Sequence, residues 1–235
     1  MSSAEPAQQA PQTRAPRLYR GMSVSERRAQ RRERLLEAGL ELFGTQGYAG
    51  VSIRAVSAAA ALNSRYFYES FSSREDLLWH VYRRIIRANV AAVIDATAGA
   101  KTLEDQARAG LRASWGLLTE DRRKARIVAL EVVGVSERLE EARRQNRHAF
   151  ADILVRNAMA FAGGSAVALR MDPLLTARSL MGALVAVLAD WVNGDVEASV
   201  EEIVEHFTCM LTAVARASVV QETAASPGGS VQRPG

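Results

Sequence analysis

The stretch of residues 52–71, SIRAVSAAAALNSRYFYESF, constrains the fold more than any other part of the chain. The apolar residues that recur at helical spacing within it are Ile53, Val56, Ala60, Phe67 and Phe71. A break at residues 62–63 separates them into two groups, so the stretch predicts two short helices joined by a tight turn. Asn63 is well placed to cap the second helix, because its side-chain oxygen can accept a hydrogen bond from a backbone N–H that the first turn leaves unpaired.

The face of the second helix opposite the two phenylalanines is polar. An arginine there can donate two hydrogen bonds to a guanine edge, and hydroxyl groups suit phosphates and bases. Arg54 in the first helix is a further candidate for a base edge, whereas Tyr68 and Ser70 suit phosphates. Partial packing of Tyr66 or Tyr68 on the first helix of the chain, which carries residues 35–43, is the alternative. The predicted DNA-reading residues are Arg54, Asn63, Ser64, Arg65, Tyr66, Tyr68 and Ser70.

These residues resemble the N-terminal DNA-binding region of the tetracycline-repressor (TetR) family. The similarity starts at LLEAGLELFGTQGY (residues 35–48), passes through the stretch above and ends at SSREDLL (residues 72–78). It implies an all-α fold of about nine helices. An N-terminal three-helix domain with a helix-turn-helix would bind DNA, and a C-terminal helical domain would bind a ligand and dimerise.

Two positions depart from the family pattern. Ala61 stands where a turn glycine is usual, and Val51 stands where a threonine usually opens the first helix of the pair. An alanine held at positive φ costs about 1 kcal/mol. Ser52 or Gly50 must then provide the cap in place of the threonine.

Composition limits the other classes of function. The chain has 235 residues, 48% of them hydrophobic, and few prolines, which fits one large or two small helical globular domains. One cysteine, Cys209, excludes an intrachain disulfide, and His80, His148 and His206 lie far apart without the spacing of metal ligands. We therefore expect no metal site and no cofactor.

Hydropathy and charge indicate location and partner. The uninterrupted apolar run at residues 180–189 is shorter than the roughly 20 residues that span a bilayer, and residues 1–16 lack the apolar core of a secretion signal. We expect a cytoplasmic protein that does not contact a membrane.

The net charge is +4, and residues 1–34 hold eight arginines but three acidic residues. This excess lies beside the predicted DNA-reading unit, as phosphate attraction requires; a solvated basic tail is the alternative.

Four segments follow from these patterns. They are a disordered basic arm (1–22), a helix-turn-helix DNA-binding domain (23–72), a helical domain for effector binding and dimerisation (73–220) and a disordered tail (221–235). The Ser-x-x-Glu pattern of a capping box at Ser23 and again at Ser72 predicts helices that begin there, the first ending at residues 44–47 and the other near residue 97. Further helices are expected at about 102–118, 120–134, 136–162, 173–192 and 196–219.

The last two predicted helices carry apolar residues at three-four spacing, and residues 173–192 are apolar nearly all round. A second copy of the chain would cover such a helix, and the resemblance implies a four-helix bundle across a two-fold axis. Packing within one chain is the alternative. The predicted dimer contacts are Ala177, Leu180, Met181, Leu184, Leu188, Trp191, Val200, Ile203, Val204, Phe207, Leu211 and Val214.

A ligand site is less clearly marked in the sequence. The resemblance implies a mostly apolar pocket in the C-terminal domain with a few polar groups. Each single candidate is more easily explained as core or surface. The candidates are Trp115, Arg126, His148, Met159 and Trp191, with Asn157, Phe161 and Asp190 beside them.

These features together predict a dimeric transcriptional repressor. It would bind a palindromic operator in double-stranded DNA and leave it when an unidentified small-molecule effector binds. The second hypothesis is an effector-independent or architectural DNA-binding dimer. An enzyme ranks third, because the sequence lacks a Gly-rich phosphate loop, a nucleophile motif and a metal-ligand cluster.

Overall fold

The computed structural model describes residues 23–161 and 171–218, apart from the side chains of residues 160, 161 and 218. Within these ranges the regular secondary structure consists of nine α-helices and one π-helical turn. The predicted all-α fold is therefore confirmed. The predicted arm at 1–22 and the predicted tail at 221–235 lie outside the described residues.

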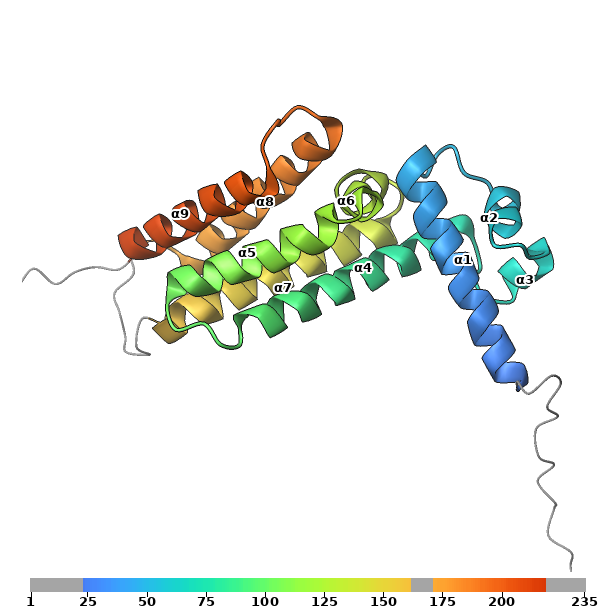
Figure 1. Cartoon of the computed structure of the whole chain (residues 1–235), viewed down its shortest axis with the longest axis horizontal. Coiled ribbons are helices and arrows are strands. Elements are labelled where there is room, and N and C mark those ends of the chain that lie inside the picture. The colour runs from blue at the N-terminus through green and yellow to red at the C-terminus, as the bar shows by residue number, and fades with distance from the viewer. Residues whose placement is uncertain (1–22, 162–170, 219–235) are drawn as a thin grey trace, which may run out of the picture.

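Helices α1 (Val24–Gln46), α2 (Ile53–Ala59) and α3 (Ser64–Tyr68) form one end of the molecule, which we call the head (Figure 1). The predicted capping box begins α1: the Glu26 N–H donates to Ser23 Oγ at 3.1 Å, and the Ser23 N–H donates to Glu26 Oε2 at 2.6 Å. Phe43 and Phe67 are completely buried between the three helices.

Helix α4 (Arg74–Thr97) belongs both to the head and to the rest of the chain. Leu77 and Leu78 at its start are completely buried in the head, and its later turns pack along α5. The apolar core is continuous through it. Helix α4 is therefore the element that the head and the later helices share.

Two details of α4 differ from the sequence prediction. Its cap is Ser73 rather than Ser72, because the Asp76 N–H donates to Ser73 Oγ at 3.0 Å, while the Ser72 N–H donates to the Asp76 carboxylate at 3.0 Å. The buried residue on the fifth turn is Asn89, 4% exposed, whereas Val90, which the helical spacing of the apolar residues in α4 predicts to face inward, is half-buried. The stripe continues at four-residue spacing from Ile85 through Asn89.

The remaining helices, which we call the body, are α5 (Leu103–Thr119), α6 (Arg122–Arg126), α7 (Glu137–Phe161), α8 (Pro173–Asn193) and α9 (Val200–Ser218). The single helix predicted at 120–134 was wrong. A side-chain cap at Asp121 starts the short α6, and the chain then widens into the π-helical turn η1 (Ile127–Glu131) before Gly134 adopts a φ of 70°. The side chains of Thr102, Ser136 and Asp172 cap the starts of α5, α7 and α8.

Helix α9 also begins later than predicted, at Val200, because Ser199 and Glu202 form a reciprocal cap there: the Ser199 N–H donates to Glu202 Oε2 at 2.8 Å, and the Glu202 N–H donates to Ser199 Oγ at 3.2 Å. Helices α5 and α9 lie against each other along much of their length.

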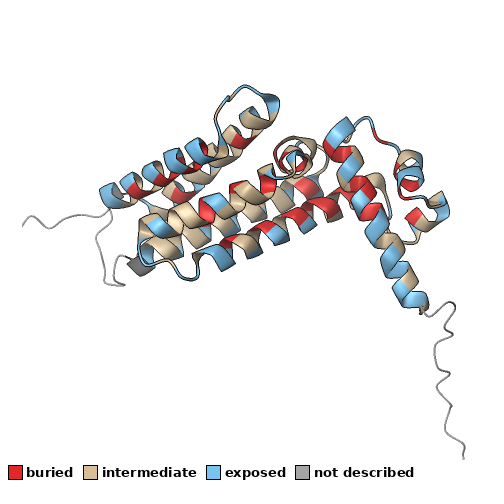
Figure 2. Cartoon of the chain, in the orientation of Figure 1, coloured by how far each residue is buried: buried red, intermediate tan, exposed pale blue. Residues whose placement is uncertain are grey.

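Helix α8 is the least covered apolar helix of the body. Only Ala177 and Leu188 of its residues are buried, and Leu175 is 67% exposed. Most of α8 has the colours of intermediate or exposed residues in Figure 2. Among the described helices, α8 alone is long and apolar enough to cross a membrane by length and composition, with a mean hydropathy of 1.5. Hence α8 has apolar surface that the monomer itself does not cover.

Candidate functional site

The helix-turn-helix of the head is formed by α2, the turn after it and α3. Ser52 caps α2 by accepting from the Ala55 N–H at 3.1 Å, so the alternative cap at Gly50 is not used. Ala61 in the turn has a φ of 50°, as the missing glycine led us to expect. The Leu62 N–H donates to the Ser57 carbonyl at 2.9 Å and closes the turn.

The orientation of α3 follows from its cap and its buried face. Asn63 Oδ1 accepts from the Arg65 N–H at 2.9 Å, and Phe67 and Phe71 pack with ring centroids 5.8 Å apart in the head core. As a result the Arg65 side chain is 84% exposed and Tyr68 is 63% exposed. The remaining predicted DNA-reading residues share this end of the head: Arg54 and Asn63 are exposed, and Ser64, Tyr66 and Ser70 are half-buried.

Arginines of α1 hold this face in position, which the sequence interpretation did not foresee. Arg28 donates to the Glu69 carbonyl at 2.8 Å, Arg31 contacts the Glu69 carboxylate at 3.4 Å and stacks over the Tyr66 ring, and Arg34 donates to the Ala61 carbonyl at 3.3 Å. Their spacing of three residues along α1 places them on one side of that helix. The packing of Tyr66 against α1, given above as an alternative, is therefore observed.

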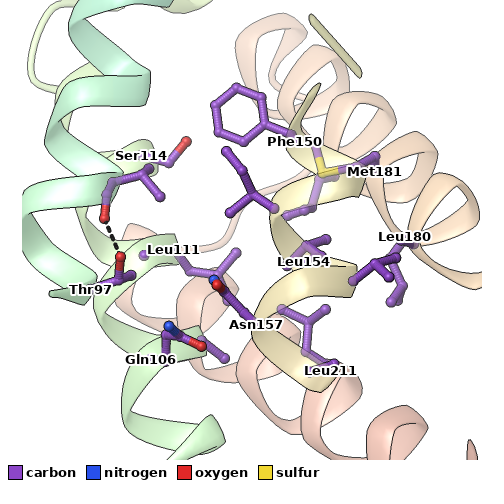
Figure 3. Close-up of a pocket in the computed structure, with 18 of the residues that line it drawn as sticks. Thr97, Gln106, Leu111, Ser114, Phe150, Leu154, Asn157, Leu180, Met181 and Leu211 are labelled. Atoms are coloured by element: carbon purple, nitrogen blue, oxygen red, sulfur yellow. Dashed lines mark hydrogen bonds between the residues drawn. The ribbon is translucent and has the colours of Figure 1, made fainter. Parts of the chain in front are cut away.

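A large cavity lies in the body. Its volume is about 580 Å³, within the range of about 300–1,000 Å³ that is typical of small-molecule sites. Side chains from α4, α5, α7, α8 and α9 converge on it, and most of them are apolar (Figure 3). Leu111, Phe150, Leu154, Leu180 and Met181 are representative.

Polar groups are few in the cavity, and two of them have no partner. Asn89 Oδ1 and Gln106 Oε1 are buried and accept no hydrogen bond from the described residues. By contrast, Thr97 donates its hydroxyl to the Val93 carbonyl of its own helix at 2.8 Å (dashed line, Figure 3). A buried acceptor without a donor costs about 1–3 kcal/mol.

The structure separates the predicted ligand residues into two groups. Trp115, Met159 and Asn157 line the cavity. Arg126 does not, because it pairs with Glu131 at 2.7 Å near the head. The others away from the cavity are His148, Asp190 and Trp191, and the Phe161 side chain lies outside the described residues. Sequence analysis missed Asn89 and Gln106; the available signal was a polar residue within an apolar helical stripe.

Several predicted dimer contacts are also placed differently. Ile203, Val204 and Phe207 are buried in the core of the single chain, where α9 packs on α5, and Leu188 is buried too. These residues are not available to a second chain, so the prediction was wrong for them, because the strongest apolar stripe of α9 serves its own monomer. Leu180, Met181, Leu184, Leu211 and Val214 line the cavity. The exposed apolar residues of α8 are instead Leu174 and Leu175.

Polar contacts connect the body to the head beside the cavity. The Tyr48 N–H at the end of the head donates to Glu131 Oε2 at 2.7 Å, and Glu131 belongs to η1, whose Val128 lines the cavity. Arg123 of α6 pairs with Glu41 of α1. On α4, burial raises the pKa of Tyr82 to about 12.

Metal coordination has no basis in the described residues, where no three His, Cys, Asp or Glu side chains lie close enough to hold an ion. The candidate sites are therefore the exposed face of α3 and the cavity.

Comparison with known proteins agrees with this arrangement. Residues 35–81 match the family model of bacterial regulatory proteins of the tetR family. No curated protein matches the chain in sequence. Solved structures match it over most of its length: the fatty acid degradation regulator FadR from Bacillus halodurans is 17% identical, with a TM-score of 0.69, and the match covers 77% of this chain and 94% of that one.

Two further structures have similar values. A putative TetR-family transcriptional regulator from Syntrophomonas wolfei is 20% identical, with a TM-score of 0.67, and the match covers 80% of this chain and 96% of that one. FadR from Bacillus subtilis in complex with stearoyl-CoA is 15% identical, with a TM-score of 0.69, and the match covers 77% of this chain and 98% of that one. The resemblance read from the sequence is thus confirmed: residues 35–81 carry the N-terminal domain of the TetR family, and the described chain has the fold of a TetR-family transcriptional regulator.

Proposed function

We propose that the protein is a dimeric transcriptional repressor that binds a palindromic operator and leaves it when a small molecule enters the cavity. One observation carries the proposal: α4 contributes Leu77 and Leu78 to the core beneath the exposed face of α3 and Asn89 to the wall of the cavity. The reading face and the cavity therefore share one rigid element. We propose no catalytic role for the protein, and we place it in the cytoplasm.

On DNA, Arg65 and Arg54 are assigned to base edges. Both are exposed, and each can donate two hydrogen bonds to a guanine. In the free protein Arg65 lies 3.6 Å from Glu69 Oε1, an exposed contact that DNA can displace at little cost. Ser64 and Tyr66 lie beside it, and Tyr68 and Ser70 are assigned to phosphates, which position the helix without reading sequence.

A second copy of the chain is proposed to cover α8. The helix is apolar, only two of its residues are buried, and Leu174 and Leu175 are exposed at its start. A two-fold arrangement would present two α3 helices to successive major grooves, about one helical turn of DNA apart. The same apolar surface accounts for the membrane-like composition of α8 without a bilayer.

Ligand control requires only that the ligand favour one position of α4. A ligand with higher affinity for the state that does not fit the operator shifts the equilibrium by the difference in its two affinities. The similar fold of FadR with stearoyl-CoA supports a cavity of this kind, although the identity of its ligand does not transfer at 15% identity. An effector-independent DNA-binding dimer is the second candidate, and the cavity of about 580 Å³ argues against it.

Selection of bound sequences from a random DNA library, at a stated salt concentration and followed by footprinting, tests the DNA-binding part. Recovery of an inverted repeat supports a sequence-reading dimer. Recovery of no motif, with binding that disappears as salt rises, leaves only a basic surface that attracts phosphates and contradicts the proposal.

Arg65→Ala then tests the assignment of the reading residue. Binding to the selected site should weaken by about 1–3 kcal/mol, and binding to random DNA should weaken less. Arg112→Ala is the matched control, because Arg112 is an exposed arginine on α5 in the body. Equal losses on both kinds of DNA would reduce Arg65 to a phosphate contact.

A further inference from the structure

The helix-turn-helix carries one acidic residue. Residues 47–73, which contain all of it, hold two arginines and a single acid, Glu69. Glu69 follows the last residue of α3 as its C-cap, four positions after Arg65, and is half-buried. We infer that Glu69 determines specificity: its carboxylate occupies arginines of α1 and α3 and thereby weakens binding to random DNA more than binding to the operator. This inference rests on the proposed function, in which α3 reads the operator.

Each carboxylate oxygen of Glu69 contacts a different arginine. Oε1 lies 3.6 Å from Arg65 Nε, and Oε2 accepts a hydrogen bond from the Arg31 guanidinium at 3.4 Å. The backbone carbonyl of Glu69 accepts a third hydrogen bond, from Arg28 at 2.8 Å. One residue thus connects three arginines, two of them through its negative charge.

The Glu69 carboxylate competes with the phosphates of random DNA. Such DNA attracts arginines through its phosphates, which are present in every sequence. A phosphate that approaches Arg65 or Arg31 must displace the carboxylate and then remains close to its negative charge. Glu69 therefore reduces the number of phosphates that the head can neutralise, and with it the affinity for random DNA.

Binding to the operator is less affected, because Glu69 also supports it. When Arg65 turns to a guanine, its new partner is an uncharged base edge rather than a phosphate. Arg31 keeps its contact with Glu69, and its guanidinium lies 4.5 Å from the centroid of the Tyr66 ring. Glu69 thus holds in place a ring beside Arg65, and a side chain that is already held loses less entropy on binding.

Glu69→Gln in the full-length protein removes the charge and keeps the size of the side chain. The dissociation constant for a duplex without the selected motif should fall about 3- to 10-fold at about 0.1 M salt, because one more arginine is free for a phosphate. The slope of log affinity against log salt concentration should become steeper by about one unit. For the selected operator the dissociation constant should change less, so the preference for the operator over random DNA should decrease.

Glu37→Gln is the matched control, because it changes the net charge of the head by the same amount. Glu37 lies on α1 and pairs with Arg84 of α4 at 2.7 Å, and Arg84 keeps its second partner, Glu33, in this variant. Affinity for both duplexes should remain within about twofold of the wild type, since salt screens a charge that lies away from α3. Glu69→Asp keeps the negative charge, so its affinity for random DNA should stay closer to the wild type than that of Glu69→Gln.

The outcomes distinguish this inference from the proposed function. Recovery of an inverted repeat together with an unchanged preference for it in Glu69→Gln contradicts the inference alone and leaves an operator-binding dimer. The same gain on random DNA in Glu37→Gln would mean that only net charge matters, which also overturns the role of Glu69. Recovery of no inverted repeat contradicts the proposed function and the specificity claim with it.

Discussion

The head and the body of this molecule are built by the same kind of helix but are filled differently. In the head, large side chains are completely buried, among them Leu35, Phe43 and Phe67, and every helix start has a side-chain cap. Outside the head, α4, α5, α7, α8 and α9 surround a cavity of about 580 Å³, and the residues with unpaired buried acceptors, Asn89 and Gln106, both line it. Packing specifies the head, whereas the body leaves room for a ligand.

The largest effect is expected from the same substitution, phenylalanine to alanine, made once in the head and once at the cavity. Phe67→Ala removes a completely buried ring from the head core and should lower the free energy of unfolding by about 3–5 kcal/mol. Phe150→Ala removes the same ring from the wall of the cavity, where one side is already empty, and should cost roughly 1 kcal/mol. Urea unfolding of both variants measures the difference. Equal costs would mean that the body is packed as tightly as the head.

A second pair of variants tests the junction. A Cβ at Gly44 of α1 would lie 2.8 Å from the Arg123 Cα of α6, so Gly44→Ala forces α1 and α6 apart and should cost about 1–3 kcal/mol. A Cβ at Gly116 of α5 meets nothing within 4 Å. Gly116→Ala should therefore stabilise α5 by about 0.5–1 kcal/mol through helix propensity alone. Thermal unfolding should show opposite shifts in Tm; shifts of the same sign would contradict the close approach of α1 and α6.

The head was largely predictable from sequence because its signals are local. The capping box at Ser23, the cap at Asn63 and the inward spacing of Phe67 and Phe71 each depend on residues within a few positions of one another. The error at Ser72 has the same local character: two adjacent serines can both cap, and the contact of Asp76 with Ser72 leaves Ser73 as the cap. For α1 and α4 the local pattern thus fixed the cap to within one residue.

The body was less predictable because its burial depends on which helix covers which face. The stripe containing Ile203, Val204 and Phe207 has the periodicity of an interface, but α5 of the same chain occupies it. An apolar stripe at helical spacing predicts that this face of the helix is buried, but it does not identify the helix or the chain that covers it. Similarly, Trp191 belongs to the apolar stripe of α8, yet its Nε1–H donates to the Ala198 carbonyl at 3.2 Å rather than facing the cavity.

A smaller prediction concerns the one position where the head is strained. Ala61 is the single non-glycine residue with positive φ among the described residues, and it is exposed in the turn between α2 and α3. Ala61→Gly removes the clash of Cβ with the backbone and should raise the free energy of unfolding by about 1 kcal/mol. Operator affinity should not fall, because Arg34 contacts the backbone carbonyl of this residue, which the substitution keeps. A loss of stability would show that the extra freedom that glycine gives the unfolded chain outweighs the relief of strain at this position.

The smallest effect is expected where the head, α4 and α7 meet. Burial lowers the pKa of His80, and the neighbouring charges of Arg32, Arg83 and Arg138 act in the same direction, while Asp76 at 3.8 Å opposes them. The folded protein therefore resists protonation of His80 more than the unfolded chain does. As pH falls below the usual histidine value of about 6.5, the unfolded chain takes up the proton first, and the folded state loses stability.

His80→Gln should remove this contribution, because glutamine does not titrate. The Tm of the wild type should fall more than that of the variant between pH 7.5 and pH 5.5, and the two should respond alike above pH 7.5. Identical responses between pH 7.5 and 5.5 would show that water solvates the protonated ring as well in the folded protein as in the unfolded chain. In that case the tight packing of the head would end before His80 on the second turn of α4, and the junction would be as open as the body.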